Sequence, residues 1–265
     1  MRLFISGLQK LSTRMATLLT FGLLAGLLVM IDLAVATTGG GGADGDGDPL
    51  ALITFPGAYS LILSFLFGLG GLFAVIYGAA IAGSEWTWGT LKTAVVRGES
   101  RSRYLLATFA AIAVVLAIGL FISFVIGVAA AVLGSMIAGI PLDGLGDTAV
   151  LGGLPELFFR GWVAITATAA LGFAVATLAR SQLAGIGVGI AFYFGETFAG
   201  IFLPDVVRYM PFHLSTAAVG GASGFGGPPD PAALTVGTAL VLVTVWLVGS
   251  LVVAAGFSER AEITG

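Results

Sequence analysis

Two carboxylates interrupt long apolar stretches of the sequence, and they are its first candidates for chemistry. Glu196 lies within the run 183–203, and Asp32 lies near the end of the run 15–36. A carboxylate in the middle of a membrane costs at least about 2.5–3.5 kcal/mol, so it normally faces protein or water. Three interpretations of Glu196 stay open: it lines a translocation path or holds a proton, it forms a structural hydrogen bond, or it is protonated without a role. Asp32 is a second candidate for the path, or a solvated group at the outer interface.

The composition excludes several other kinds of site. The chain has no cysteine and one histidine, His213, so thiolate metal sites, cysteine nucleophiles and histidine clusters are impossible. The 11 basic residues against 14 acidic ones give a net charge of -3, which excludes the basic field of a nucleic-acid binder. With 58% hydrophobic and only 9% charged residues, the chain is not an ordinary soluble enzyme. We therefore predict a polytopic membrane protein.

Apolar runs predict an all-α membrane domain with six transmembrane helices. Each run is continuously apolar rather than alternating, which favours helices over a membrane barrel. The third run is long enough for two short spans, but no proline or polar turn interrupts it before Gly139, so we predict one long helix. We treat residues 1–265 as a single transmembrane domain, with spans at about 15–36, 58–83, 104–138, 161–179, 183–203 and 232–257.

The distribution of basic residues predicts the orientation of these spans. With six spans and a cytoplasmic N-terminus, only Arg160 and Arg208 of the 11 basic residues fall on the outer side. The positive-inside rule therefore places both termini in the cytoplasm. A cleaved signal ending at Ala34-Val35-Ala36 is the competing interpretation of the N-terminus, but its apolar run is longer than the usual 7–15 residues.

Residues 1–14 have the spacing of a short amphipathic helix. Phe4, Leu8, Leu11 and Met15 follow helical spacing, and the intervening basic residues suit lipid headgroups. We expect a helix lying on the inner membrane face. The alternative is a helical extension of the first span.

The connection 84–103 between spans two and three carries more polar detail than a passive loop needs. It contains Glu85, two tryptophans and four of the 11 basic residues, and Thr90–Val96 can form a short helix. Gly89 permits a tight turn, and Thr90 suits the start of the helix as its N-cap. The alternative is a positively charged anchor that only fixes topology.

This connection resembles the cytoplasmic coupling loop of type-2 ABC exporter permeases, the six-span membrane subunits that work with a separate ATPase. The order of parts is similar over nearly the whole chain, from the surface helix before span one to the apolar external segment Arg208–Phe212. The chain lacks the proline that many members carry before the Ser-Arg element. The matching positions are Glu85, Trp88, Gly89, Thr90, Leu91, Lys92, Arg97, Ser100, Arg101 and Arg103.

The resemblance implies a role, partners and a location. The chain would pair with a second copy or a sister permease in the plasma membrane of a prokaryote. It would have no cofactor and no enzymatic activity of its own, since ATP and Mg would be bound by the ABC ATPase; the sequence also lacks a Walker A phosphate loop. Glu85 would pair with basic residues of the ATPase or cap the helix start. Residues implied in coupling to the ATPase are Glu85, Trp88, Gly89, Thr90, Lys92, Arg97 and Arg101.

Two other classes of function stay open. A gradient-driven secondary carrier would use Glu196 as its proton site, although carriers usually contain internal repeats and we find no convincing repeat between the halves. A membrane scaffold or sensor would transport nothing. Two small-residue pairs, Gly22/Gly26 and Gly185/Gly189, have the spacing of close helix contacts in either case.

Overall fold

The computed structural model describes residues 2–38, 49–90, 93, 96, 98–220 and 234–260. Over these ranges the chain is helical and contains no strand, so the all-α prediction is confirmed. Six helices are long and apolar enough to cross a membrane. The elements are α1 (Arg2–Ser12), α2 (Met15–Thr38), η1 (Pro49–Leu52), α3 (Gly57–Thr87), α5 (Arg101–Ala138), η2 (Asp143–Gly146), α6 (Thr148–Ala179), α7 (Gln182–Phe202), α8 (Pro204–Val207), α9 (Pro211–Ala218) and α10 (Val236–Arg260).

Two helices, α5 and α6, compare the spans predicted from hydropathy with the helices of the structure. The third apolar run forms one helix, α5, of 38 residues, as predicted. Helix α6 begins at Thr148, well before the predicted start at 161. In the sequence, the charges of Glu156 and Arg160 lie directly before the apolar run and set its predicted start. In the structure the two side chains pair with each other, one turn apart on the same helix. The charged segment therefore continues the helix instead of ending it.

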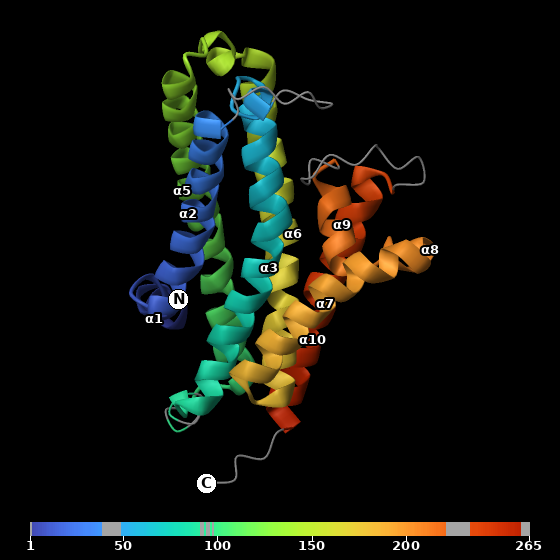
Figure 1. Ribbon diagram of the computed structural model, residues 1–265. Helices are drawn as coiled ribbons and strands as arrows, with labels where there is room; N and C mark the ends of the chain where they lie inside the picture. Colours follow the sequence, from blue (N-terminus) through green and yellow to red (C-terminus); the bar gives the residue numbers. More distant parts are fainter. Residues whose placement is uncertain are drawn as a thin grey trace.

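Helix α3 is the central element of the bundle. It packs against α6, α7, α5 and α2, and it supplies more buried residues of the main apolar core cluster than any other described helix. Figure 1 shows α2, α3, α5 and α6 as a tall bundle, with α7, α8, α9 and α10 grouped on one side of it. The turn between α5 and α6 is at one end of the molecule, and the end of α3, helix α1 and the end of α10 are toward the other.

The contact between α3 and α6 depends on two glycines. A Cβ atom at Gly78 would lie 2.1 Å from the carbonyl oxygen of Ala169, and one at Gly172 would lie 2.1 Å from that of Val75. Only glycine allows the two backbones to approach so closely. Gly185 of α7 is similarly close to Ala176.

Helix α1 is a separate element from α2, not an extension of it. Its apolar residues Phe4, Leu8 and Leu11 pack on the core, with Leu11 fully buried, and α1 lies against α5. Met15, the fourth residue of the predicted stripe, begins α2 and is exposed. The apolar face of α1 is thus partly covered by this chain, since Phe4 and Leu8 stay half-buried.

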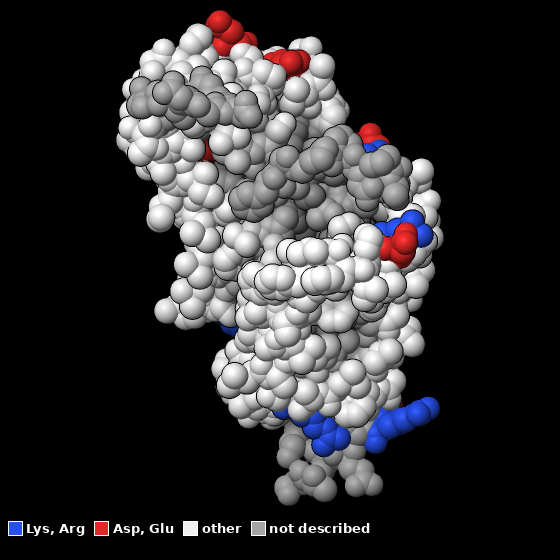
Figure 2. All heavy atoms as spheres, turned by 45° about the vertical axis from the view of Figure 1, so that its right-hand side comes forward, with Lys and Arg blue, Asp and Glu red and all other residues white. Residues whose placement is uncertain are grey.

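Charged side chains gather at the two ends of the molecule. Figure 2 shows basic groups at the end that carries the last turn of α10 and acidic groups at the opposite end. Few charges lie on the white surface between them in this view. The protein is therefore a multi-pass membrane protein with chemically different ends, and the cytoplasmic position of the basic end stays a prediction.

Candidate functional site at the end of helix α3

Glu85 lies in the last turn of α3 and is only 1% exposed. Its Oε1 accepts from the Lys10 ammonium at 2.7 Å and from the Arg14 guanidinium at 3.2 Å. Its Oε2 accepts from the Tyr104 hydroxyl at 2.6 Å and from the Thr90 hydroxyl. We call these five residues the Glu85 cluster. Burial of the carboxylate is compensated because both of its oxygens receive hydrogen bonds.

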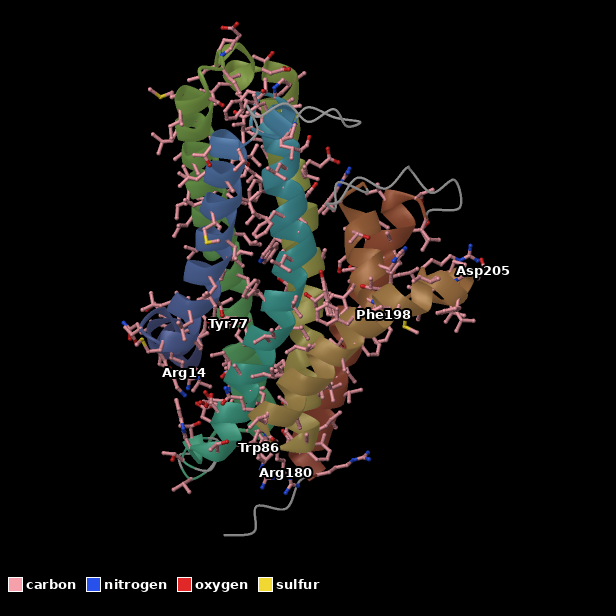
Figure 3. All side chains as sticks on the ribbon, in the orientation of Figure 1. Arg14, Tyr77, Trp86, Arg180, Phe198 and Asp205 are labelled. Carbon is pink, nitrogen blue, oxygen red and sulfur yellow. The ribbon has the colours of Figure 1, made fainter. Side chains whose placement is uncertain are left out.

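The cluster joins α3, which carries Glu85, to four other parts of the chain. Lys10 belongs to α1, Arg14 to the α1–α2 turn, Thr90 to the loop 84–103 and Tyr104 to the first turn of α5. Arg14 extends the network, since it also donates to the Ser84 hydroxyl at 2.8 Å. Figure 3 shows Arg14 near the α1 end of the bundle. The Glu85 cluster therefore connects the loop 84–103 to α1, α3 and α5.

The predicted coupling residues divide into three groups. Glu85 and Thr90 form part of the cluster, and Trp88 contacts it because the Arg14 guanidinium lies 4.8 Å from its ring centre. Trp88 itself is exposed, and Gly89 makes the expected tight turn with φ +66°. Lys92 and Arg97 lie outside the described residues.

Arg101 lies apart from the cluster, at the junction of α5 with α10. Its guanidinium donates to the Ser258 carbonyl at 3.2 Å, and the neighbouring Ser102 amide donates to Glu259 at 3.0 Å. The same end of the molecule holds Arg180, whose guanidinium lies over the rings of Trp86 and Phe257 (Figure 3). The end of the loop 84–103 is thus attached to the last turn of α10.

The local geometry differs from two expectations for this loop. The structure gives Glu85 partners inside the chain, rather than leaving its oxygens free for basic residues of another protein. The Thr90 hydroxyl, expected to accept as an N-cap, instead donates to the Glu85 side chain and to its backbone carbonyl. Both groups hold the loop against the bundle.

Glu196 is buried in α7 and accepts hydrogen bonds from the start of α9. The amides of Phe212 and His213 donate to its Oε2 at 3.1 and 2.9 Å. These are free N–H groups of the first helical turn, which a carboxylate satisfies favourably. Of the three interpretations, this geometry favours the structural hydrogen bond. The His213 side chain is exposed, and over the described ranges no group of three or more potential ligands could hold a metal ion.

Asp32 is not the solvated interfacial group that its position near the run's end predicted. It is 0% exposed, and neither carboxylate oxygen has a hydrogen-bond partner within the described part of the chain. The structure does not bring it together with Glu196 either. Helix α2 packs on α3 and α5, whereas α7 packs on α3 and α6. The solvated interpretation is wrong because α5 and the segment around Ile53 cover this turn of α2.

Sequence reasoning missed Lys10, Arg14 and Tyr104 as functional neighbours of Glu85. One signal was present, because Lys10 and Arg14 are four residues apart, a spacing that places side chains on one helix face. Tyr104 gave no signal beyond its place after the basic residues that open α5. Their common partner became visible only in the folded chain.

Comparison with known proteins gives the family. The family model described as "Protein of unknown function (DUF2705)" matches residues 48–255. The chain belongs to this family. The DUF2705 match runs from before α3 into α10, so it includes Glu85 and Glu196 but not Lys10 and Arg14.

One curated relative is similar at low identity. "Uncharacterized protein YhcI" of Bacillus subtilis (strain 168) is 24% identical over 210 residues, which cover 74% of this chain and 65% of that protein. The DUF2705 chain thus spans just under two thirds of the relative's length.

Proposed function

We propose that the chain is the transmembrane permease subunit of an ATP-driven ABC exporter, coupled to a separate ATPase through the loop 84–103. The Glu85 cluster is the observation that carries the proposal. A permease without its own nucleotide site needs a mechanical connection from its inner surface to its spans. The cluster supplies one, since a single buried carboxylate holds the loop to α1, α3 and α5.

The proposed mechanism uses the loop as a lever. ATP and Mg bind to the ATPase chains, which close on each other and push the exposed part of the loop, including Trp88. Gly89 gives the loop its turn, and the Glu85 cluster passes the force to the bundle. The hydrogen bonds of Arg101 and Ser102 to the last turn of α10 pass the force on to that helix. The inner cavity between two permease subunits then closes and the outer side opens.

The carrier alternative requires Glu196 to bind and release protons during transport. Its carboxylate is instead held by two backbone amides of α9 inside the same chain. A helix cap whose bonds are satisfied within the fold does not need a second role. We therefore do not propose a carrier.

The test begins with the intact protein. The tagged chain, extracted from native membranes in mild detergent, is expected to bring an ABC ATPase at about one copy per permease, measured by quantitative mass spectrometry. Absence of an ATPase from an oligomeric preparation would refute the proposal. It would then favour a scaffold or sensor.

Coupling is tested separately from binding. Glu85→Gln should keep the ATPase bound but reduce its activity in the reconstituted complex, because the loop loses its charged attachment to α1. Glu156→Gln is the matched control, since this carboxylate is exposed and pairs with Arg160 on the same helix. Equal ATPase activity in the two variants would contradict the lever assignment.

A further inference from the structure

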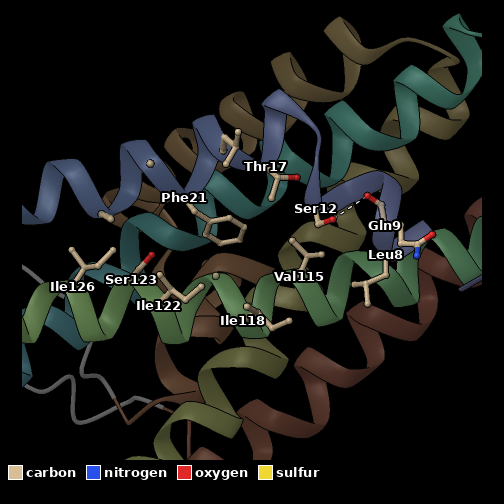
Figure 4. A pocket seen from close by; sticks show the side chains of 14 residues that line it. Leu8, Gln9, Ser12, Thr17, Phe21, Val115, Ile118, Ile122, Ser123 and Ile126 are labelled. Atoms are coloured by element: carbon tan, nitrogen blue, oxygen red, sulfur yellow. Dashed lines mark hydrogen bonds between the residues drawn. The ribbon is translucent and has the colours of Figure 1, made fainter. Parts of the chain in front are cut away.

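An elongated apolar groove of about 630 Å³ lies between α1, α2 and α5, away from both Glu85 and Glu196. Pockets that take small molecules measure about 300–1,000 Å³, so this groove has the size of a binding site. Figure 4 shows α2 on one side of it, α5 on the other and α1 at one end. Its lining includes Gln9 and Ser12 of α1, Thr17 and Phe21 of α2, and Ile118 and Ile122 of α5.

We propose that this groove binds one acyl chain of an anionic membrane phospholipid, with the headgroup at the α1 end. The walls belong to two helices that are long and apolar enough to span the membrane. Leu18, Ile118 and Ile122 line the groove and are exposed on its rim. The molecules that surround such a surface in a bilayer are lipid chains.

The length of the groove fits one leaflet. The lining residues of α5 run from Val115 to Ile126. At about 1.5 Å per helical residue these 11 steps measure roughly 16 Å, close to half of the ~30 Å hydrocarbon core. A single chain entering beside α1 would therefore fill the groove from the membrane surface to its middle. The Ser123 hydroxyl also lies in the wall of the groove, and it is buried without a hydrogen-bond partner among the described residues.

The α1 end has the polarity of a headgroup site. Gln9 and Ser12 are exposed there, and the Gln9 side-chain amide can donate to ester or phosphate oxygens, whereas the Ser12 hydroxyl donates to the Gln9 carbonyl at 3.0 Å. Lys10 and Arg14 do not line the groove, but they belong to the same α1–α2 segment; they share the single carboxylate of Glu85, so these three groups keep one positive charge near this end. A basic surplus beside the membrane surface attracts anionic lipids.

The experiment fills the groove without disturbing the fold. A Cβ atom at Gly22 meets no atom within 4 Å, and Gly22 lines the groove, so Gly22→Leu places a side chain in the space for the lipid. Gly26→Leu is the matched control, because Gly26 is equally open and exposed on the same helix but does not line the groove. Both variants should stay monodisperse in detergent.

The probe is phosphatidylglycerol with a photoreactive group in its acyl chain, diluted into phosphatidylcholine vesicles containing the purified chain alone. Labelling, mapped by mass spectrometry, should fall on residues 17–25 and 115–126. Gly22→Leu should lower it about five-fold or more, since overpacking opposes binding, whereas Gly26→Leu should not. The phosphatidylcholine analogue should label about five-fold less, as expected for one surplus charge.

Three results would overturn the proposal. Equal labelling of the three proteins would show that no chain occupies the groove. Equal labelling by the two lipids would show that the groove does not select an anionic headgroup. A change in oligomeric state with Gly22→Leu alone, with labelling unaffected, would identify a second copy of the chain as the occupant. No ATPase is present, so these outcomes do not depend on the exporter proposal.

Discussion

Glu85→Gln is the sharpest test of what holds the end of α3 to its neighbours. The change removes the negative charge that Lys10 and Arg14 share. It also places an amide donor next to the Thr90 and Tyr104 hydroxyls, which in the wild type donate to the Glu85 carboxylate. Removing one partner of a buried ion pair costs about 3–5 kcal/mol. The side chains of Lys10 and Arg14 are 33% and 11% exposed, so water partly compensates them, and glutamine keeps one acceptor. We therefore expect the lower end of the range, about 3 kcal/mol.

The measurement is thermal unfolding of the purified protein in detergent. For chains of this size about 1 kcal/mol lowers Tm by roughly 2–4 °C, so Glu85→Gln should lower Tm by about 6–12 °C. Lys10→Gln should lower Tm less in the Glu85→Gln variant than in the wild type, because the partner charge of Lys10 is already gone in that variant.

The control is Glu156→Gln, which removes an exposed carboxylate paired one turn away on α6. Such a pair contributes about 0.3–0.5 kcal/mol, so its Tm should change by no more than about 2 °C. If Glu85→Gln is no less stable than this control, the cluster does not hold the end of α3. The lever mechanism then loses its physical basis.

Three further changes test other parts of the structure by the same Tm measurement. Gly78→Ala should lower Tm strongly, because its Cβ would collide with the α6 backbone, whereas Gly68→Ala meets open space and should be tolerated; similar values would disprove the close α3–α6 contact. Glu196→Ala should cost about 0.5–2 kcal/mol, as loss of a helix cap does, and an unchanged Tm would remove that role. Asp32→Ala should raise stability by about 1 kcal/mol, because it removes a buried carboxylate without a hydrogen-bond partner in the described chain; a fall in Tm would reveal a partner or a function.

The six spans could be predicted from the sequence because a membrane span is a local property. Twenty or more apolar residues in a row must form a helix in a bilayer, whatever surrounds them. The early start of α6 could not be predicted in the same way, since Glu156 and Arg160 look like a loop in a hydropathy profile. The two side chains can pair only when the segment is helical, because a helix brings residues four apart onto the same face.

The site was harder to predict because it depends on contacts between distant segments. The coupling loop and Glu85 could be found from local sequence, but Lys10 lies 75 residues earlier in the chain. Asp32 shows the opposite error, because its place near the end of an apolar run suggested solvent. The cover comes from α5 and the segment around Ile53, which no local pattern reveals. Burial of a single polar group is a tertiary property.

The separation between Lys10 and Glu85 also has a consequence during biosynthesis. At about 5–20 residues per second, the 75 residues between them take roughly 4–15 s to synthesise. For that time Lys10 and Arg14 are unneutralised charges at the start of the first span, which is the condition under which basic residues orient a nascent chain. Once α3 is complete, Glu85 reaches the same two cations. Two residues suited to orienting the nascent chain thus become the anchor of the finished protein.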